Sequence, residues 1–123
     1  MKKILVTGSN GRFGKILKSL KDNKKFIFRD RKQLNILSLS SIKKNIKQFK
    51  PSSILHLAGL SRPMSMHEVE ISKSIDLNII GTSNLVKECA ERNVKIIYLS
   101  TNYIYQGTKG NYKETDPLKP WNN

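Results

Sequence analysis

The chain has 123 residues, of which 37% are hydrophobic and 26% are charged, and its formal net charge is +14. This length allows one domain at most, and the composition is that of a soluble globular protein. The apolar runs are too short to span a membrane, and polar residues follow Ile4-Leu5-Val6 too early for a secretory signal.

The first predicted elements are a buried strand over 3–7, a glycine-rich turn over 7–14 and an amphipathic helix. Apolar residues recur at helical spacing from Phe13 to Leu20, with lysines largely on the other side. Backbone N–H groups and the positive end of the helix would meet in this turn. Such a point suits a pyrophosphate.

Each glycine of the turn has an expected role. We expect Gly8 to permit a tight turn, Gly11 to let a phosphate approach the backbone, and Gly14 to let the helix pack closely on the strand. A phosphate-loop NTPase is excluded, because Ile16 stands where that motif requires serine or threonine.

Further strands are predicted over 25–29, 53–57 and 95–99, and further helices over 39–49 and 75–92, with Asn93 as a left-handed cap. Residues from Ser100 onward are rich in glycine and proline and are predicted as loop. This alternation predicts an α/β fold, a Rossmann-type parallel sheet in the order 3-2-1-4, with a ligand crevice between strands one and four. An open, apolar fourth strand favours self-association and indicates a fold truncated after strand four.

The positive charge is concentrated in residues 1–50, which contain 15 lysine and arginine residues against two acidic ones. Residues 51–123 contain 8 against 7. Such a basic half can attract nucleic acid, an anionic cofactor or an acidic partner surface. Nucleic acid is not favoured, because aromatic residues for base stacking are not interleaved with the lysines.

Three isolated residues have ordinary structural interpretations. Cys89, the single cysteine, excludes an internal disulfide and favours a reducing, cytoplasmic location, and we expect its thiol to be buried. We expect His56 to pack within the third strand rather than act as a ligand or base. His67 is expected at the surface, and the sequence predicts no metal site.

Four motifs follow one another in the chain: T-G-x-x-G-x-x-G at 7–14, H-L-A-G at 56–59, N-x-x-G-T at 78–82 and L-S-T-N-Y-I-Y-Q-G at 99–107. Together they resemble the extended short-chain dehydrogenase/reductase family. The last motif, with Y-K-E-T-D-P at 112–117, resembles its dTDP-4-dehydrorhamnose reductase branch. The resemblance implies that residues 1–123 are the N-terminal, NAD(P)-binding part of a reductase of nucleotide-linked 4-keto sugars, without its substrate domain.

The resemblance also implies the dinucleotide contacts. The pyrophosphate would lie against Gly8, Asn10, Gly11, Arg12, Phe13 and Gly14, the adenosine near Arg29, Asp30, Arg31, Asn35 and Ile36, and the connecting path along Ala58, Gly59 and Leu60. An aspartate can accept from the 2′-hydroxyl of NAD and an arginine can pair with the 2′-phosphate of NADP, so the choice of cofactor is open and slightly favours NADP. Asn35 stands where the family commonly has aspartate, and its amide can still bond a base edge.

Two further roles follow from the same resemblance. Asn78 would tie the long helix to the sheet. Thr101 matches the catalytic hydroxyl that orients the substrate oxygen, but the family's Tyr-x-x-x-Lys does not appear where it belongs, and its tyrosine would fall next after Asn123. Tyr105 and Lys109 have the right spacing, yet they lie in a predicted loop that cannot align them.

Three other functions remain open from the sequence. An NAD-dependent nucleotide-sugar epimerase or dehydratase would share every motif through residue 82. A non-catalytic regulatory subunit or cofactor sensor would keep the dinucleotide site without the tyrosine. A basic nucleic-acid binder would show steep salt dependence.

Overall fold

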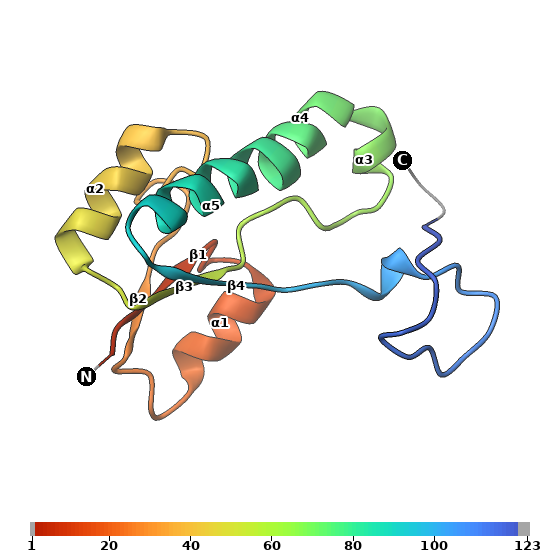
Figure 1. Cartoon of the computed structure of the whole chain (residues 1–123), viewed down its shortest axis with the longest axis horizontal. Coiled ribbons are helices and arrows are strands. Elements are labelled where there is room, and N and C mark those ends of the chain that lie inside the picture. Colours follow the sequence, from red (N-terminus) through yellow and green to blue (C-terminus); the bar gives the residue numbers. More distant parts are fainter. Residues whose placement is uncertain (1, 121–123) are drawn as a thin grey trace.

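The computed structural model of the chain describes residues 2–120. The predicted alternation is confirmed: four parallel strands form one sheet with helices on both faces (Figure 1). The strands are β1 (Ile4–Thr7), β2 (Phe26–Phe28), β3 (Ser53–His56) and β4 (Lys95–Tyr98). The helices between them are α1 (Arg12–Ser19), α2 (Leu39–Phe49), α3 (Met66–Val69), α4 (Ile71–Ile75), the π-helix η1 (Asp76–Ile80) and α5 (Gly81–Glu91).

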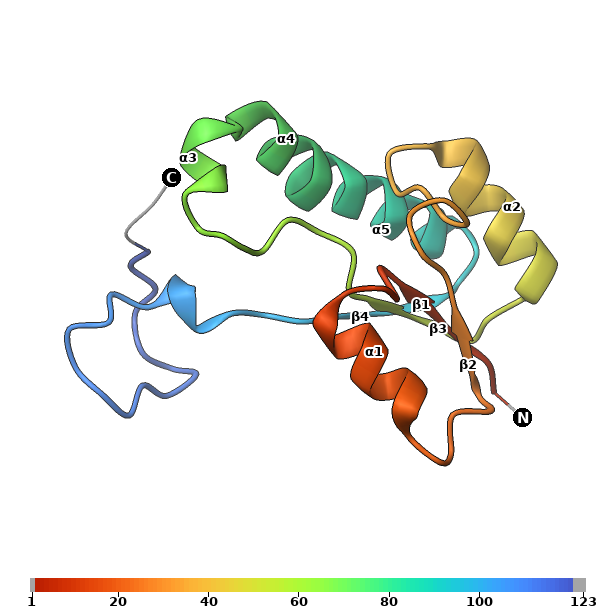
Figure 2. The same ribbon diagram turned by 180° about the vertical axis from the view of Figure 1, so that it is seen from behind.

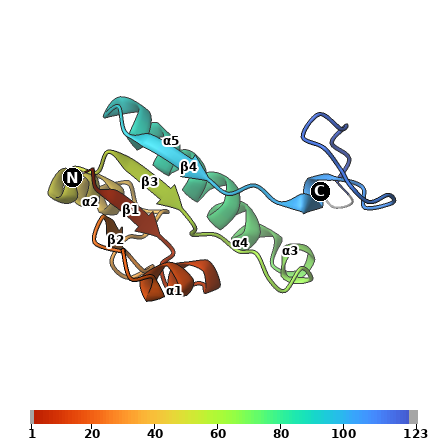
Figure 3. The same ribbon diagram turned by 90° about the horizontal axis from the view of Figure 1, so that it is seen from below.

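The strand order is β2-β1-β3-β4, so the predicted order 3-2-1-4 is wrong. Strand β1 lies between β2 and β3 (Figure 3). Its Leu5 pairs with Ile27 of β2 on one side and with Ile54 of β3 on the other. The reason is that α1 packs on one face of the sheet and α2 on the opposite face. Right-handed crossovers on opposite faces move the chain in opposite directions, so the winding already reverses after β2. The point of reversal, where a ligand crevice is expected, therefore lies between β1 and β3 rather than between strands one and four.

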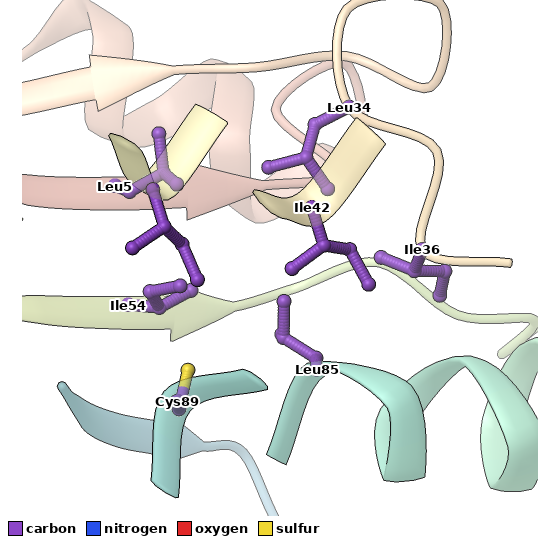
Figure 4. Packing of buried hydrophobic residues seen from close by; sticks show 8 residues of the cluster. Leu5, Leu34, Ile36, Ile42, Ile54, Leu85 and Cys89 are labelled. Atoms are coloured by element: carbon purple, nitrogen blue, oxygen red, sulfur yellow. The ribbon is translucent and has the colours of Figure 1, made fainter. Parts of the chain in front are cut away.

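The hydrophobic core lies between the sheet and the layer formed by α2 and α5 (Figure 4). Leu5 and Ile54 from neighbouring strands meet Ile42 from α2 and Leu85 from α5, and all four are fully buried. Burying such a side chain stabilises the fold by about 2 kcal/mol. Cys89 joins the same cluster, which confirms its predicted burial, and burial raises the pKa of its thiol to about 11.

The opposite face of the sheet carries α1 alone and is less well covered (Figure 2). Phe13 and Ile16 of α1 remain 46% and 58% exposed, and Ile97 of β4 is 39% exposed. The open fourth strand expected from the sequence is therefore accompanied by apolar side chains of α1 that are also exposed.

The long helix begins earlier than predicted. It runs from Ile71 through a π-helical turn to Glu91, whereas the sequence predicted 75–92, and the short helix α3 before it was not predicted. Asn93 has a φ of 51°, which confirms the left-handed cap.

The segment after β4 is loop as predicted, apart from a 3₁₀ turn over Asn102–Ile104. The last three residues of that prediction, 121–123, lie outside the described part of the chain. Within residues 2–120, no helix has both the length and the apolar character needed to cross a membrane.

Candidate functional site

The turn between β1 and α1 is pressed against the segment that follows β3. Gly8 has a φ of 63°, and a Cβ on it would lie 2.6 Å from both the Cα and the amide nitrogen of Ala58. Only glycine meets both conditions, since other residues rarely adopt this φ and the backbone leaves no space. The predicted role of Gly8 in a tight turn is confirmed.

The other two glycines differ from each other in what surrounds them. A Cβ on Gly14 would lie 2.4 Å from the carbonyl oxygen of Ser9, which confirms the predicted close packing, although against the turn rather than the strand. Gly11 has an ordinary backbone conformation (φ −68°, ψ 171°), and the nearest atom to a Cβ would be the Gly8 oxygen at 3.3 Å. The backbone conformation at Gly11 therefore does not require glycine. Its expected role, to let a phosphate approach the backbone, stays a prediction.

The N-terminus of α1 is open to an anion. Gly11 is its N-cap residue and no side chain caps the helix. The N–H groups of the first turn of a helix have no partner within the helix, and the helix dipole makes this end positive. An anionic group at this turn would meet free donors and favourable charge.

A buried hydrogen-bond network joins the carboxyl ends of β1 and β3. The Thr7 hydroxyl oxygen accepts from the backbone N–H groups of Leu57 and Ala58, each at 3.1 Å, and contacts His56 Nδ1 at 2.8 Å. The Nε2 atom of His56 lies 3.0 Å from the hydroxyl of Thr82 in α5. The sequence predicted packing for His56, and its burial confirms this, but these polar partners were missed.

The network defines the protonation of His56. Because the Thr7 oxygen accepts two N–H groups, its own proton points to Nδ1, and Nε2–H then donates to Thr82. Burial lowers the pKa of His56 from 6.5 to about 4, so the ring is neutral near neutral pH. A neutral ring fits this arrangement of donors and acceptors, and the network holds the carboxyl ends of β1 and β3 together.

Asn78 holds the segment after β3 from the other side. Its Oδ1 accepts from the Leu60 N–H at 2.7 Å, and its Nδ2 donates to the Leu60 carbonyl at 2.9 Å. A Cβ on Gly59 would lie 2.9 Å from this Oδ1, so the segment passes close to the π-helix that carries Asn78. These bonds tie the long helix to the end of β3, the role that the resemblance implied.

Asp30, after β2, is turned toward the glycine turn and its own loop. Its Oδ1 accepts from the N–H groups of Lys32 (2.9 Å) and Gln33 (3.0 Å), and its Oδ2 accepts from Asn10 Nδ2 at 3.3 Å. The structure thus brings Asn10 and Asp30 together from the loops that follow β1 and β2.

The other residues predicted near the adenosine are placed differently from one another. The Arg29 guanidinium lies over the Phe49 ring of α2, 4.2 Å from its centroid, whereas Arg31 is exposed. Asn35 Oδ1 accepts from the Leu37 N–H, and Ile36 is buried in the core. The Ile36 side chain is therefore closed to a ligand, and its carbonyl accepts from Asn84 Nδ2 at 3.3 Å.

The predicted catalytic hydroxyl lies on the segment that leaves the sheet after β4. Thr101 is exposed, and its oxygen accepts from the Tyr103 N–H at 3.2 Å. Tyr105 follows the 3₁₀ turn and donates to the Lys113 carbonyl, while Lys109 lies 3.5 Å from Asp116. Tyr105 and Lys109 share no helix. This confirms the prediction that they lie in a loop, which does not align residues four positions apart.

His67 departs from the prediction of a surface residue. It is half-buried, and its Nδ1 lies 2.6 Å from the Ser74 hydroxyl across the junction of α3 and α4. Neither helix was separately predicted, so this contact could not be foreseen.

The comparisons with known proteins agree with this architecture. A family model described as the RmlD substrate binding domain matches residues 1–123. The chain belongs to this family. It is 32% identical over 124 residues to a dTDP-4-dehydrorhamnose reductase from Aggregatibacter actinomycetemcomitans, an alignment that covers 98% of the chain and 42% of that relative.

Two further proteins are similar to the chain. The chain is also 32% identical over 130 residues to methionine adenosyltransferase 2 subunit beta from Xenopus tropicalis, covering 98% of the chain and 39% of that protein. The dTDP-4-dehydrorhamnose reductase from Bacillus anthracis, solved in complex with NADP, superposes with a TM-score of 0.87 at 27% identity, over 98% of the chain and 44% of that structure. The chain thus spans about two fifths of the length of these relatives.

The predicted resemblance to the dTDP-4-dehydrorhamnose reductase branch is confirmed by these matches. The Rossmann-type fold is confirmed as well. Two of these relatives are dTDP-4-dehydrorhamnose reductases, and one of them was solved with NADP.

Proposed function

We propose that the chain binds NADP or NAD in the crevice between β1 and β3, as the cofactor-binding half of a reductase of nucleotide-linked 4-keto sugars. The glycine turn carries this proposal. Gly8 and Gly14 leave no space for a side chain, and the adjoining helix end is uncapped. The glycines let the turn fold tightly beside β3, and the uncapped helix end supports a pyrophosphate at this position. When bound, the cofactor supplies the hydride.

The residues that would hold the cofactor form three groups. We propose that the pyrophosphate lies on the turn of Gly8, Asn10, Gly11, Arg12, Phe13 and Gly14. The adenosine would lie beside Asp30, Arg31 and Asn35, and the path between them along Ala58, Gly59 and Leu60. The hydrogen bonds of Thr7 and Asn78 to this last segment hold it in place before any ligand arrives.

We propose a preference for NADP. The carboxylate of Asp30 already accepts three hydrogen bonds, which leaves less capacity for the 2′-hydroxyl of NAD. Arg31 next to it is exposed, and no partner occupies its guanidinium in the described part of the chain. A free guanidinium suits a 2′-phosphate, and the Bacillus anthracis relative was solved with NADP.

A second candidate function follows from the second relative. The identity to methionine adenosyltransferase 2 subunit beta equals the identity to the Aggregatibacter reductase. A non-catalytic subunit of this kind would keep the dinucleotide crevice without an acid for the reaction. The coding sequence that follows the codon for Asn123 separates the two candidates, because Tyr-Gly-x-x-Lys in frame indicates an enzyme.

We propose that these 123 residues alone give no turnover, since no tyrosine–lysine pair shares a helix near Thr101 within residues 2–120. A positioned acid or base contributes about 10²–10⁴-fold to such reactions. The assay is NADPH oxidation with dTDP-4-dehydrorhamnose, using the natural chain and a Tyr105→Phe variant. Turnover by the first that is lost in the second would contradict this expectation.

We also propose that the open edge of β4 is covered by a second copy of the chain. In the described residues, β4 pairs only with β3, and Ile97, Tyr98 and Leu99 are 39%, 57% and 47% exposed. An unpaired apolar strand is a template for another strand. The single, buried cysteine supports a cytoplasmic location for this assembly.

A further inference from the structure

A groove with a basic rim lies between α2 and the end of α5. It has a volume of about 590 Å³, and its cationic lining consists of Lys43, Lys44, Lys47, Lys50 and Arg92. Lys50 lies shortly before β3 and Arg92 shortly before β4. The groove is therefore at the amino edge of the sheet. The turn between β1 and α1, with its glycines, is at the carboxyl edge (Figure 1).

The floor of the groove is apolar. Ile46, Pro51 and Val94 line it, and the first two are buried while Val94 is half-buried. No aromatic residue is among the groove's described lining. A ligand here would therefore meet positive charge at the rim and aliphatic surface below.

Two of the cationic side chains at the rim are paired with glutamates of α5. Glu88 is 1% exposed and pairs with Arg92 and, at 3.5 Å, with Lys43, and Glu91 also pairs with Arg92. Lys44, Lys47 and Lys50 form no ion pair with any residue between 2 and 120. Cations near a helix C-terminus favour the helix, but this effect is confined to the last turn and does not account for Lys44.

From this arrangement we propose that the groove binds an acidic peptide segment of a partner protein, with apolar side chains between the acidic ones. The three unpaired lysines would meet carboxylates, and the floor would take the apolar side chains. Single-stranded nucleic acid fits less well, because its bases would have no aromatic surface on which to stack. This binding involves none of the residues proposed for the dinucleotide.

The test measures fluorescence anisotropy of a labelled peptide of alternating glutamate and leucine with the whole chain. A peptide in which serine replaces leucine tests the apolar floor, and an oligothymidylate tests nucleic acid. The groove variant is Lys44→Glu with Lys47→Glu. The matched control is Lys15→Glu with Lys21→Glu, which makes the same change of charge on exposed residues of α1 and the turn after it.

We expect the groove variant to bind the glutamate–leucine peptide about tenfold more weakly than the natural chain, and the control to bind within about twofold of it. The serine peptide should bind more weakly than the leucine peptide. Equal losses in both variants would show attraction to net charge alone and would overturn the proposal. So would undetectable peptide binding, or oligothymidylate binding that is as tight and equally sensitive to the groove variant.

Discussion

His56 is the residue that joins the two strands beside the crevice. Its ring connects Thr7 of β1 with Thr82 of α5, and it stacks on Tyr98 of β4 with 5.4 Å between ring centroids. These contacts satisfy both ring nitrogens in a buried place, where an unpaired polar atom would be costly.

The stability of the chain should depend on the protonation of His56. Burial lowers its pKa from 6.5 to about 4, so below pH 6.5 the unfolded chain takes up a proton that the folded chain resists. The stabilisation is fully present above pH 6.5 and is lost as the pH falls toward 4. We expect this residue to account for a decrease of roughly 3 kcal/mol in the free energy of unfolding over that window.

Urea denaturation at a series of pH values measures this effect. A His56→Gln variant, which cannot titrate, should show a shallower fall in stability between pH 6.5 and 4 than the natural chain. The same slope in both proteins would contradict the role assigned to the neutral ring.

At the scale of elements, the π-helix η1 gives the long helix its hold on the segment after β3. The wider turn presents Asn78 to Leu60, and both polar atoms of the amide are used. Asn84 lies in the α-helical part that follows, α5, and makes a single hydrogen bond, from its Nδ2 to the Ile36 carbonyl at 3.3 Å. The two residues therefore offer a matched comparison.

Replacing Asn78 with alanine should destabilise the fold by about 1–3 kcal/mol, because the Leu60 N–H and carbonyl lose their partner. Asn84→Ala should cost less, about 1 kcal/mol. Chemical denaturation gives both values, and hydrogen exchange should show the Leu60 amide deprotected only in Asn78→Ala. Equal destabilisation by the two substitutions, with unchanged hydrogen-exchange protection of the Leu60 amide, would contradict the role given to the Asn78–Leu60 hydrogen bonds.

The elements differ in how far the sequence predicted them. The bounds of α2 were predicted to the residue, since Ser38 caps it by accepting from the Ser41 N–H and Pro51 follows its end. These signals are local. The strand order was wrong because hydrophobic periodicity does not tell on which face of a sheet a helix packs, and the π-helix has no local signal of its own.

In the candidate site, too, features with a local sequence signal were predicted and features that depend on packing were not. The tight turn at Gly8 follows from a short motif and is confirmed, whereas Gly14 permits close packing against Ser9 of the turn rather than against the strand. The partners of His56 could not be predicted, because Thr7 and Thr82 are 49 and 26 positions away in sequence and only the fold brings them together. The placement of Arg29 on Phe49 depends in the same way on the packing of α2.

At the scale of the whole molecule, the proposed self-association rests on the uneven cover of the sheet. A two-fold pairing of β4 with a second copy would continue the sheet and cover Ile97. We expect sedimentation velocity to show a concentration-dependent dimer. An Ile97→Lys variant should dissociate at about tenfold higher concentration than the natural chain, since it places a charge in the contact.

Val69→Lys is the control for this measurement, because Val69 is 79% exposed in α3 and lies outside the β4 edge. It should leave the dimer unchanged. A chain that is monomeric at all concentrations, or that responds equally to both substitutions, would contradict pairing through β4.

The central claim is that the crevice between β1 and β3 binds a dinucleotide on the glycine turn. Gly11 allows a direct test, because its φ of −68° suits any residue and a Cβ would meet only the Gly8 oxygen at 3.3 Å. A Gly11→Val variant should therefore keep the fold if the Gly8 carbonyl shifts by a few tenths of an ångström, while its side chain fills the space proposed for the pyrophosphate.

The deciding measurement is calorimetric titration of NADPH into the natural chain and into Gly11→Val, with thermal unfolding of both as the check on folding. The account predicts binding by the natural chain and loss of the binding heat in the variant at a similar unfolding temperature. Absence of binding by the natural chain, or an unchanged affinity in Gly11→Val, would contradict it.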